Sequence, residues 1–118
     1  MDIIQEMEKI NESVYSNNRI ILEKSQENEI ISRFLKSYKG SLMESITHET
    51  DLSDKPVFKN ADTRNAELIK RLESDEDFLA KEKSLKDNEE TIKRLTVDNE
   101  YLKKKFEIYK LTGYTNIK

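Results

Sequence analysis

The sequence has no cysteine and no tryptophan, and its 118 residues include one histidine, one proline and two glycines. Without cysteine there is neither a disulfide nor a thiolate metal site. No apolar run approaches the roughly 20 residues that a membrane-spanning helix needs. The first residues, MDIIQEMEK, are acidic and lack the apolar core of a signal peptide. We therefore expect a soluble, cytoplasmic protein with no membrane partner.

Sequence motifs typical of catalytic sites are also missing. The one histidine, His48, lies in a polar segment with Glu44, Glu49 and Asp51 nearby, where an exposed loop residue is a simpler interpretation than a metal ligand. There is no glycine-rich phosphate loop, no nucleophile elbow and no paired histidine spacing. The sequence predicts that the protein is not an enzyme and uses no cofactor or metal.

Charged residues make up 38% of the chain and hydrophobic residues 35%, a balance typical of disordered chains or of extended helices. Periodicity distinguishes these two classes. Residues 1–46 carry two columns of mostly apolar residues at heptad spacing, which predicts one long amphipathic helix. The columns are Met7, Val14, Ile21, Asn28, Leu35 and Leu42, and Ile3, Ile10, Asn17, Lys24, Ile31, Tyr38 and Ser45. Gly40, followed by Ser41 and Glu44 at capping-box spacing, predicts a break late in this helix.

Residues 47–59 have no helical period and contain Pro56, so they predict a connector. The helical pattern returns over residues 60–112, with Asp62 or Thr63 as its N-cap. Within it, the acidic run 73-ESDED-77 either caps a new helix or forms the exposed side of a continuous one. The heptad columns that follow are Phe78, Leu85, Ile92, Asn99 and Phe106, and Lys81, Asn88, Leu95, Leu102 and Tyr109. Thr112 and Gly113 predict a helix end, and residues 113–118 a loose tail.

Two long amphipathic helices joined by a connector predict an all-α fold, a single helical hairpin or coiled-coil domain. A pair of helices has no enclosed centre and leaves apolar faces exposed, so we expect a homo-oligomer. The predicted oligomer seam consists of Asn17, Asn28, Leu35, Phe78, Leu85, Asn88, Ile92, Leu95, Asn99, Leu102 and Phe106. Asparagine on a seam costs stability but fixes register. We therefore expect Asn99→Leu to raise thermal stability or change the oligomer mass.

Charge is unevenly distributed, although the formal net charge is only −3. One basic cluster, Arg33, Lys36 and Lys39, has Phe34 and Tyr38 interleaved with it. A second cluster is Lys103, Lys104 and Lys105. Cations beside aromatic rings suit single-stranded nucleic acid, because phosphates meet the cations and bases stack on the rings. The alternative is structural: Phe34 and Tyr38 have the spacing of core residues, and lysines near a helix C-terminus oppose the helix dipole.

The stretch 66-AELIKRLESDEDFLAKEKSL-85 resembles the C-terminal region of the UvsY family, the recombination mediators of T-even phages. The shared features are the acidic and hydrophobic start, Asp75 and Asp77 before Phe78-Leu79, and Ser84-Leu85. The segments Arg33-Phe34 and Tyr38-Lys39-Gly40 are similar to that family's basic and aromatic segment before a glycine. This chain departs from the family in being more acidic, shorter at its N-terminus and longer in its connector.

The resemblance implies an all-helical oligomeric ring that binds single-stranded DNA and contacts the single-strand-binding protein and the recombinase. Such a mediator helps to load the recombinase by displacing the binding protein. The family's DNA contacts carry over to Arg33, and less directly to Lys36 and Lys39. Two other functions stay open from the sequence. One is a phage-type adaptor or inhibitor that binds another protein, and the other is a coiled-coil scaffold without nucleic-acid binding. If the chain is phage-encoded, its compartment is the bacterial host cytoplasm.

Overall fold

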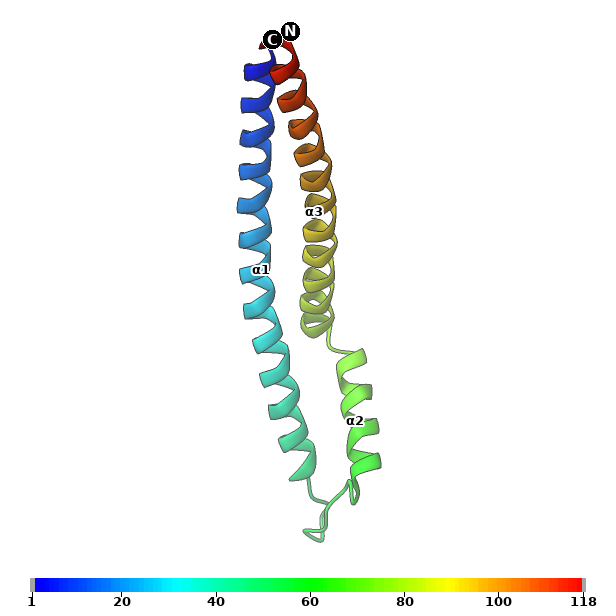
Figure 1. The fold of residues 1–118 in the computed structure, drawn as a ribbon. Coiled ribbons are helices and arrows are strands. Elements are labelled where there is room, and N and C mark those ends of the chain that lie inside the picture. Colours follow the sequence, from blue (N-terminus) through cyan, green and yellow to red (C-terminus); the bar gives the residue numbers. More distant parts are fainter. Residues whose placement is uncertain (1, 118) are drawn as a thin grey trace. The chain divides into compact units, whose positions relative to one another are not determined.

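The computed structural model describes residues 2–117, with side chains described as far as Gly113. Helix α1 comprises Ile3–Thr47, α2 comprises Ala61–Glu73 and α3 comprises Glu76–Ile117 (Figure 1). The described residues contain no strand, and one isolated bridge joins Thr50 to Pro56. The predicted all-α class is confirmed. Within the described range, every helix is too short or too polar to cross a membrane.

Packing divides the chain into two compact units. Unit 1 consists of Met1–Glu27 with Asp87–Lys118, and unit 2 consists of Asn28–Lys86. Inside unit 1, Asn17 of α1 bonds to Asn99 of α3, and Glu27 bonds to Asn88. Since the partner number falls as the α1 number rises, the two helices of this unit run antiparallel.

Unit 2 has the same antiparallel arrangement. Asn28 bonds to the backbone oxygen of Leu85, and Tyr38 bonds to Asp75. Its core consists of Leu35 from α1, Leu72 from α2 and Phe78 from α3, each no more than 9% exposed. Five partly buried residues pack against this core: Ile31, Tyr38, Leu42, Leu68 and Leu85. The heptad columns therefore lie on the buried side of the helices, as their period requires.

A capping side chain begins α3 and interrupts the C-terminal helical segment. Asp75 Oδ1 accepts a hydrogen bond from the backbone N–H of Phe78 at 3.0 Å. Ser74 is the C-cap of α2. The acidic run 73-ESDED-77 therefore marks a boundary between two helices, because a carboxylate satisfies N–H groups that the first helical turn leaves unpaired.

The N-cap of α2 is Asn60, one of the residues just before the predicted caps. Asn60 Oδ1 accepts a hydrogen bond from the Thr63 N–H at 2.8 Å, and Thr63 Oγ1 accepts one from the Asn60 N–H at 3.3 Å. This is a reciprocal capping box. Thr63 therefore contributes to the cap as its third helical residue, and the prediction that Asp62 or Thr63 is the cap itself is wrong by a few residues.

Two helix ends predicted from glycine are also wrong. Helix α1 continues through Gly40, Ser41 and Glu44 to Thr47, and α3 continues through Gly113 to Ile117. Glycine permits a helix end but does not force one, and its cost within a helix is only about 1 kcal/mol. The predicted loose tail overlaps the end of α3, and Lys118 lies outside the described residues.

The connector between α1 and α2 contains a compact hydrogen-bonded turn. The Asp51 backbone N–H donates to the Lys55 oxygen at 2.8 Å, and Asp51 Oδ1 accepts from the N–H groups of Ser53 and Lys55. Asp54 has a φ of 59°, in the left-handed region that aspartate tolerates. The short side chain of Asp51 thus satisfies backbone donors inside the turn, which explains the absence of helical period here.

Candidate binding surfaces

The first predicted basic cluster is built around a stack of three rings. Phe34 and Tyr38 stack with their centroids 6.0 Å apart, and Tyr38 lies 5.8 Å from Phe78. The Lys81 ammonium lies over the Phe34 ring at 4.7 Å, and Lys39 lies over Phe78 at 5.5 Å. The rings therefore already have partners within unit 2, and only Phe34 is exposed to a large extent, at 44%.

Carboxylates border this ring stack. The Tyr38 hydroxyl donates a hydrogen bond to Asp75, which also accepts one from the Phe78 N–H. Both bonds favour the charged carboxylate, and they lower the pKa of Asp75 below its ordinary value. The same Asp75 contact raises the pKa of the Tyr38 hydroxyl. A recess of about 120 Å³ lies between the rings and Asp75 and Asp77. Two negative charges at its wall oppose a phosphate.

The cations of this cluster are mostly engaged as well. Arg33 pairs with Glu29 of the same helix at 3.2 Å, an exposed pair one helical turn apart. Lys39 is used in the ring contact described above. Lys36 is exposed and forms no ion pair among the described residues. Of the three cations of this first cluster, only Lys36 has neither an ion pair nor a ring contact in the described residues.

The second predicted cluster lies on α3 in unit 1. Lys103 and Lys104 are exposed, and neither forms an ion pair within the described part of the chain. Lys105 is half-buried, with its ammonium 5.9 Å from the centre of the Tyr109 ring. Tyr101, which the sequence analysis did not single out, is 65% exposed and lies three residues, almost one turn, before Lys104. Lys110 is also exposed without an ion pair in the described residues, so the C-terminal half of α3 offers three available cations and one exposed ring there.

Asparagines form polar layers between the helices of unit 1. Asn99 is 6% exposed; its Oδ1 accepts a hydrogen bond from Asn17 at 3.0 Å, and its Nδ2 donates to Asn18 at 2.9 Å. Asn88 is 8% exposed and donates to a Glu27 carboxylate oxygen at 3.1 Å. In the described residues no buried side-chain nitrogen or oxygen lacks a partner. These amides are therefore satisfied inside the chain.

The residues predicted as an oligomer seam therefore pack between helices of one chain, and their burial needs no second copy. In unit 1, Leu95 is buried beside Asn88 and Asn99, while Ile92, Leu102 and Phe106 are half-buried. In unit 2, Leu35 and Phe78 are buried, and Asn28 and Leu85 are half-buried. The heptad period identifies which face is covered, but it does not say whether the covering helix belongs to the same chain.

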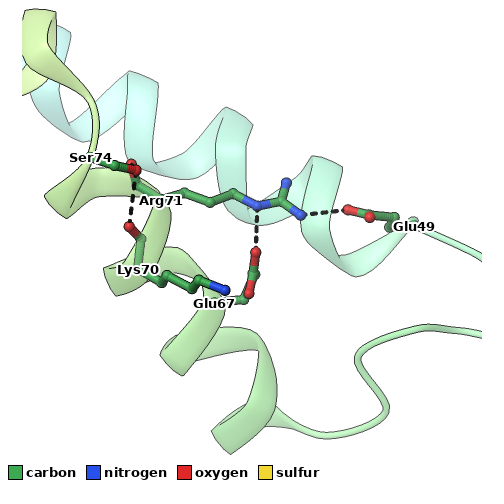
Figure 2. Close-up of polar contacts among 5 residues, drawn as sticks. All are labelled: Glu49, Glu67, Lys70, Arg71 and Ser74. Carbon is green, nitrogen blue, oxygen red and sulfur yellow. Dashed lines mark hydrogen bonds and ion pairs between the residues drawn. The ribbon is translucent and has the colours of Figure 1, made fainter.

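Arg71 links the end of α1 to α2 in unit 2. Its guanidinium bonds to Glu67 at 2.8 Å and to Glu49, just beyond α1, at 2.7 Å (Figure 2). The same guanidinium lies over the Phe58 ring at 5.9 Å. These contacts raise the pKa of Arg71, hydrogen bonding to Glu49 being the largest cause. A guanidinium with two carboxylate partners has a structural role here, because it ties the connector to α2.

Groups suited to metal binding do not gather anywhere in residues 2–117, and His48 is an exposed residue just after α1. Three recesses are lined by residues of unit 2. The described surface carries exposed cations, exposed carboxylates, exposed rings and exposed apolar side chains. Comparison with protein-family models, with curated proteins and with solved structures finds no significant match to this chain.

Proposed function

We propose that the chain is a non-enzymatic, self-associating helical protein that binds single-stranded DNA and acts as a recombination or replication mediator. In this role it contacts a single-strand-binding protein and a recombinase in the bacterial cytoplasm and helps to load the recombinase. The observation that carries the proposal is the C-terminal half of α3. There Lys103 and Lys104 are exposed without an ion pair in the described residues, and Lys104 follows the exposed ring of Tyr101 by three residues, almost one turn.

The chemistry of this segment suits a single strand better than a duplex. Ammonium groups bind phosphates without reading sequence, and an exposed ring can stack on an unpaired base. Lys110 lies seven residues after Lys103, so it falls on the same face two turns along the helix. Residues 31–39 are less suited, because their rings are packed and Asp75 and Asp77 adjoin them. We therefore expect the main DNA contact on α3.

Fluorescence anisotropy with a labelled single-stranded oligonucleotide tests this proposal. At about 50 mM salt, wild-type protein at micromolar concentration should bind, because phosphate contacts are strongest at low salt. The variant Lys103→Glu/Lys110→Glu should bind more weakly. Its salt dependence should fall by about 1.4 in slope, since each single-strand phosphate contact contributes about 0.7.

The matched control is Arg33→Glu/Lys36→Glu, which makes the same charge change on α1. It should retain most of the binding, because one of its two cations is already paired with Glu29. Absence of wild-type binding at about 50 mM salt would refute direct DNA binding. An equal loss in both double variants would indicate a diffuse charge effect without a contact on α3.

A second candidate function is a protein adaptor, inhibitor or scaffold without nucleic-acid binding. The favouring observation is that Val97, Ile108 and Leu111 share the exposed side of α3 with the lysines. Aliphatic side chains stack poorly on bases but pack well against another helix. A pull-down that recovers one partner protein and is unaffected by nuclease treatment, together with no oligonucleotide binding, would favour this function.

A further inference from the structure

Helix α3 carries a second apolar stripe on the side away from its partner helix in unit 1. The residues Val97, Tyr101, Ile108 and Leu111 are between 63% and 66% exposed, whereas Leu95 and Asn99 of the same helix are at most 8% exposed. With Lys104 they follow each other at steps of four, three, four and three residues. This is the spacing of a helix-packing face. We call these five residues the outer stripe of α3.

Helix α1 has a comparable outer stripe in the same unit. Ile4, Tyr15 and Leu22 are 68%, 64% and 58% exposed. Glu8, Asn11 and Asn18 fill the intermediate positions at steps of four and three residues. From Ile4 to Leu22 the stripe is roughly 27 Å long, and the outer stripe of α3 is roughly 21 Å long. The two stripes therefore match in period and nearly match in length.

We infer that the outer stripe of α1 docks antiparallel on the outer stripe of α3 from a second copy of this chain. This inference specifies the self-association that is part of the proposed function. Several registers keep the steps of four and three in phase, and one of them brings two apolar pairs together. It places Ile4 against Ile108, Glu8 against Lys104 and Tyr15 against Val97. The contact thus joins two apolar pairs and one pair of opposite charges.

Charge complementarity favours packing of the α3 stripe against the α1 stripe of another copy, compared with packing against that copy's α3 stripe. Residues 1–30 contain seven acids and three bases, whereas residues 102–118 contain five lysines and one glutamate. Pairing the α3 stripes of two copies is also in phase, but it joins two segments of the same charge sign, since both copies contribute the lysine-rich end of α3. Like charges at such a contact are unfavourable, whereas Glu8 opposite Lys104 is favourable.

The geometry has a consequence for assembly. Each copy presents two different surfaces, and each surface is complementary to the other one on a neighbour. A contact of this kind propagates from copy to copy, and it closes into a ring if the rotation between copies permits. Lys103 and Lys110 lie outside the stripe, so they stay available for phosphate, whereas Lys104 and the Tyr101 ring are used between copies.

Light scattering after size-exclusion chromatography tests the docking by charge exchange. Wild-type protein should have a mass that is a multiple of the monomer. Glu8→Lys and Lys104→Glu should each weaken self-association about five-fold or more per contact, because attraction becomes repulsion. The double variant Glu8→Lys/Lys104→Glu should restore the wild-type mass. Ile30→Glu, at an equally exposed position of α1 outside the stripe, is the control and should leave the mass unchanged.

Cross-linking tests the register, since the chain has no cysteine of its own. A mixture of Ile4→Cys and Ile108→Cys chains should form the mixed disulfide dimer under mild oxidation. A mixture of Val97→Cys and Ile108→Cys chains should not, whereas the symmetric α3 pairing would produce that product.

Three outcomes overturn the docking. They are a monomeric wild-type protein at high concentration, a multimer whose mass ignores both charge reversals, and failure of the double variant to restore the mass. The outcome of the DNA-binding measurements can be distinguished from the outcome of these tests of docking. The Lys103→Glu/Lys110→Glu variant should keep the wild-type mass, and DNA binding by a monomer would support the DNA contact while refuting the docking.

Discussion

The polar layer at Asn99 in unit 1 gives the sharpest test of the energetics of this fold. Asn99 is 6% exposed and bonds to both Asn17 and Asn18. Replacing it by leucine gains about 2 kcal/mol from burying an apolar side chain. It also removes two neutral hydrogen bonds, each worth about 1 kcal/mol. The two effects nearly cancel, so the increase in stability expected from the sequence shrinks to about zero for the single change.

Replacing both partners gives a different result. In Asn17→Leu/Asn99→Leu, no amide of this bonded pair is left without its partner, and Asn18 is exposed enough to bond to water. The half-buried position 17 adds about 1 kcal/mol of apolar burial to the gain at position 99. We therefore expect the double variant to be about 1 kcal/mol more stable than wild type. That difference corresponds to roughly 4 °C in Tm for a chain of this size.

Urea unfolding followed by circular dichroism measures the difference, and a thermal scan checks its sign. Asn65→Leu, an exposed position of α2, is the control for the higher helix propensity of leucine. The mass should not change, because the asparagines bond within one chain. A double variant less stable than wild type by more than about 1 kcal/mol would contradict the reasoning, and so would a change in mass.

Three further changes test other parts of the structure. Gly40→Ala should raise the free energy of unfolding by about 1 kcal/mol, measured by urea titration, because Gly40 lies inside α1 and a Cβ there has open space around it. Phe78→Ala should lower it by about 3–5 kcal/mol, since the ring is the centre of the unit 2 core, while Leu79→Ala should cost far less; equal losses would contradict that core assignment. Asp75 has a lowered pKa in the folded state, so its contribution to stability is complete above its ordinary value of 3.8 and is lost as the pH falls below that value towards the folded pKa. Tyr38→Phe removes the main cause, so the stability of this variant should depend less steeply on pH below 3.8, and an unchanged acid profile would refute the role of the hydroxyl.

Sequence periodicity predicted the helical segments because a heptad pattern sums over many residues. The faces carrying Leu35, Phe78 and Leu95 are buried in the structure as their columns imply. Local signals were less reliable. Gly40 and Gly113 did not end helices, because one glycine costs little compared with continued hydrogen bonding along the helix.

The binding surfaces were harder to predict than the helices. The basic and aromatic pattern of residues 31–39 is real, but Asp75 comes from a distant part of the sequence and changes the electrostatics of that site. Nothing in the local sequence of α1 reveals that neighbour. The outer stripe of α3 could have been found, because Tyr101 and Ile108 repeat at seven residues in a different phase from the seam. This second pattern is weaker than the pattern of the heptad columns on the same helix.

The order of contacts along the chain has a consequence for folding kinetics. Turn bonds join residues only four apart, Arg71 and Glu49 are 22 apart, Tyr38 and Asp75 are 37 apart, and Asn17 and Asn99 are 82 apart. Each contact near the turn shortens the loop that the next, more distant contact must close. The helices can therefore pair progressively, starting from the turn. On the ribosome, Asn17 of α1 must wait until Asn99 has emerged before its partner exists.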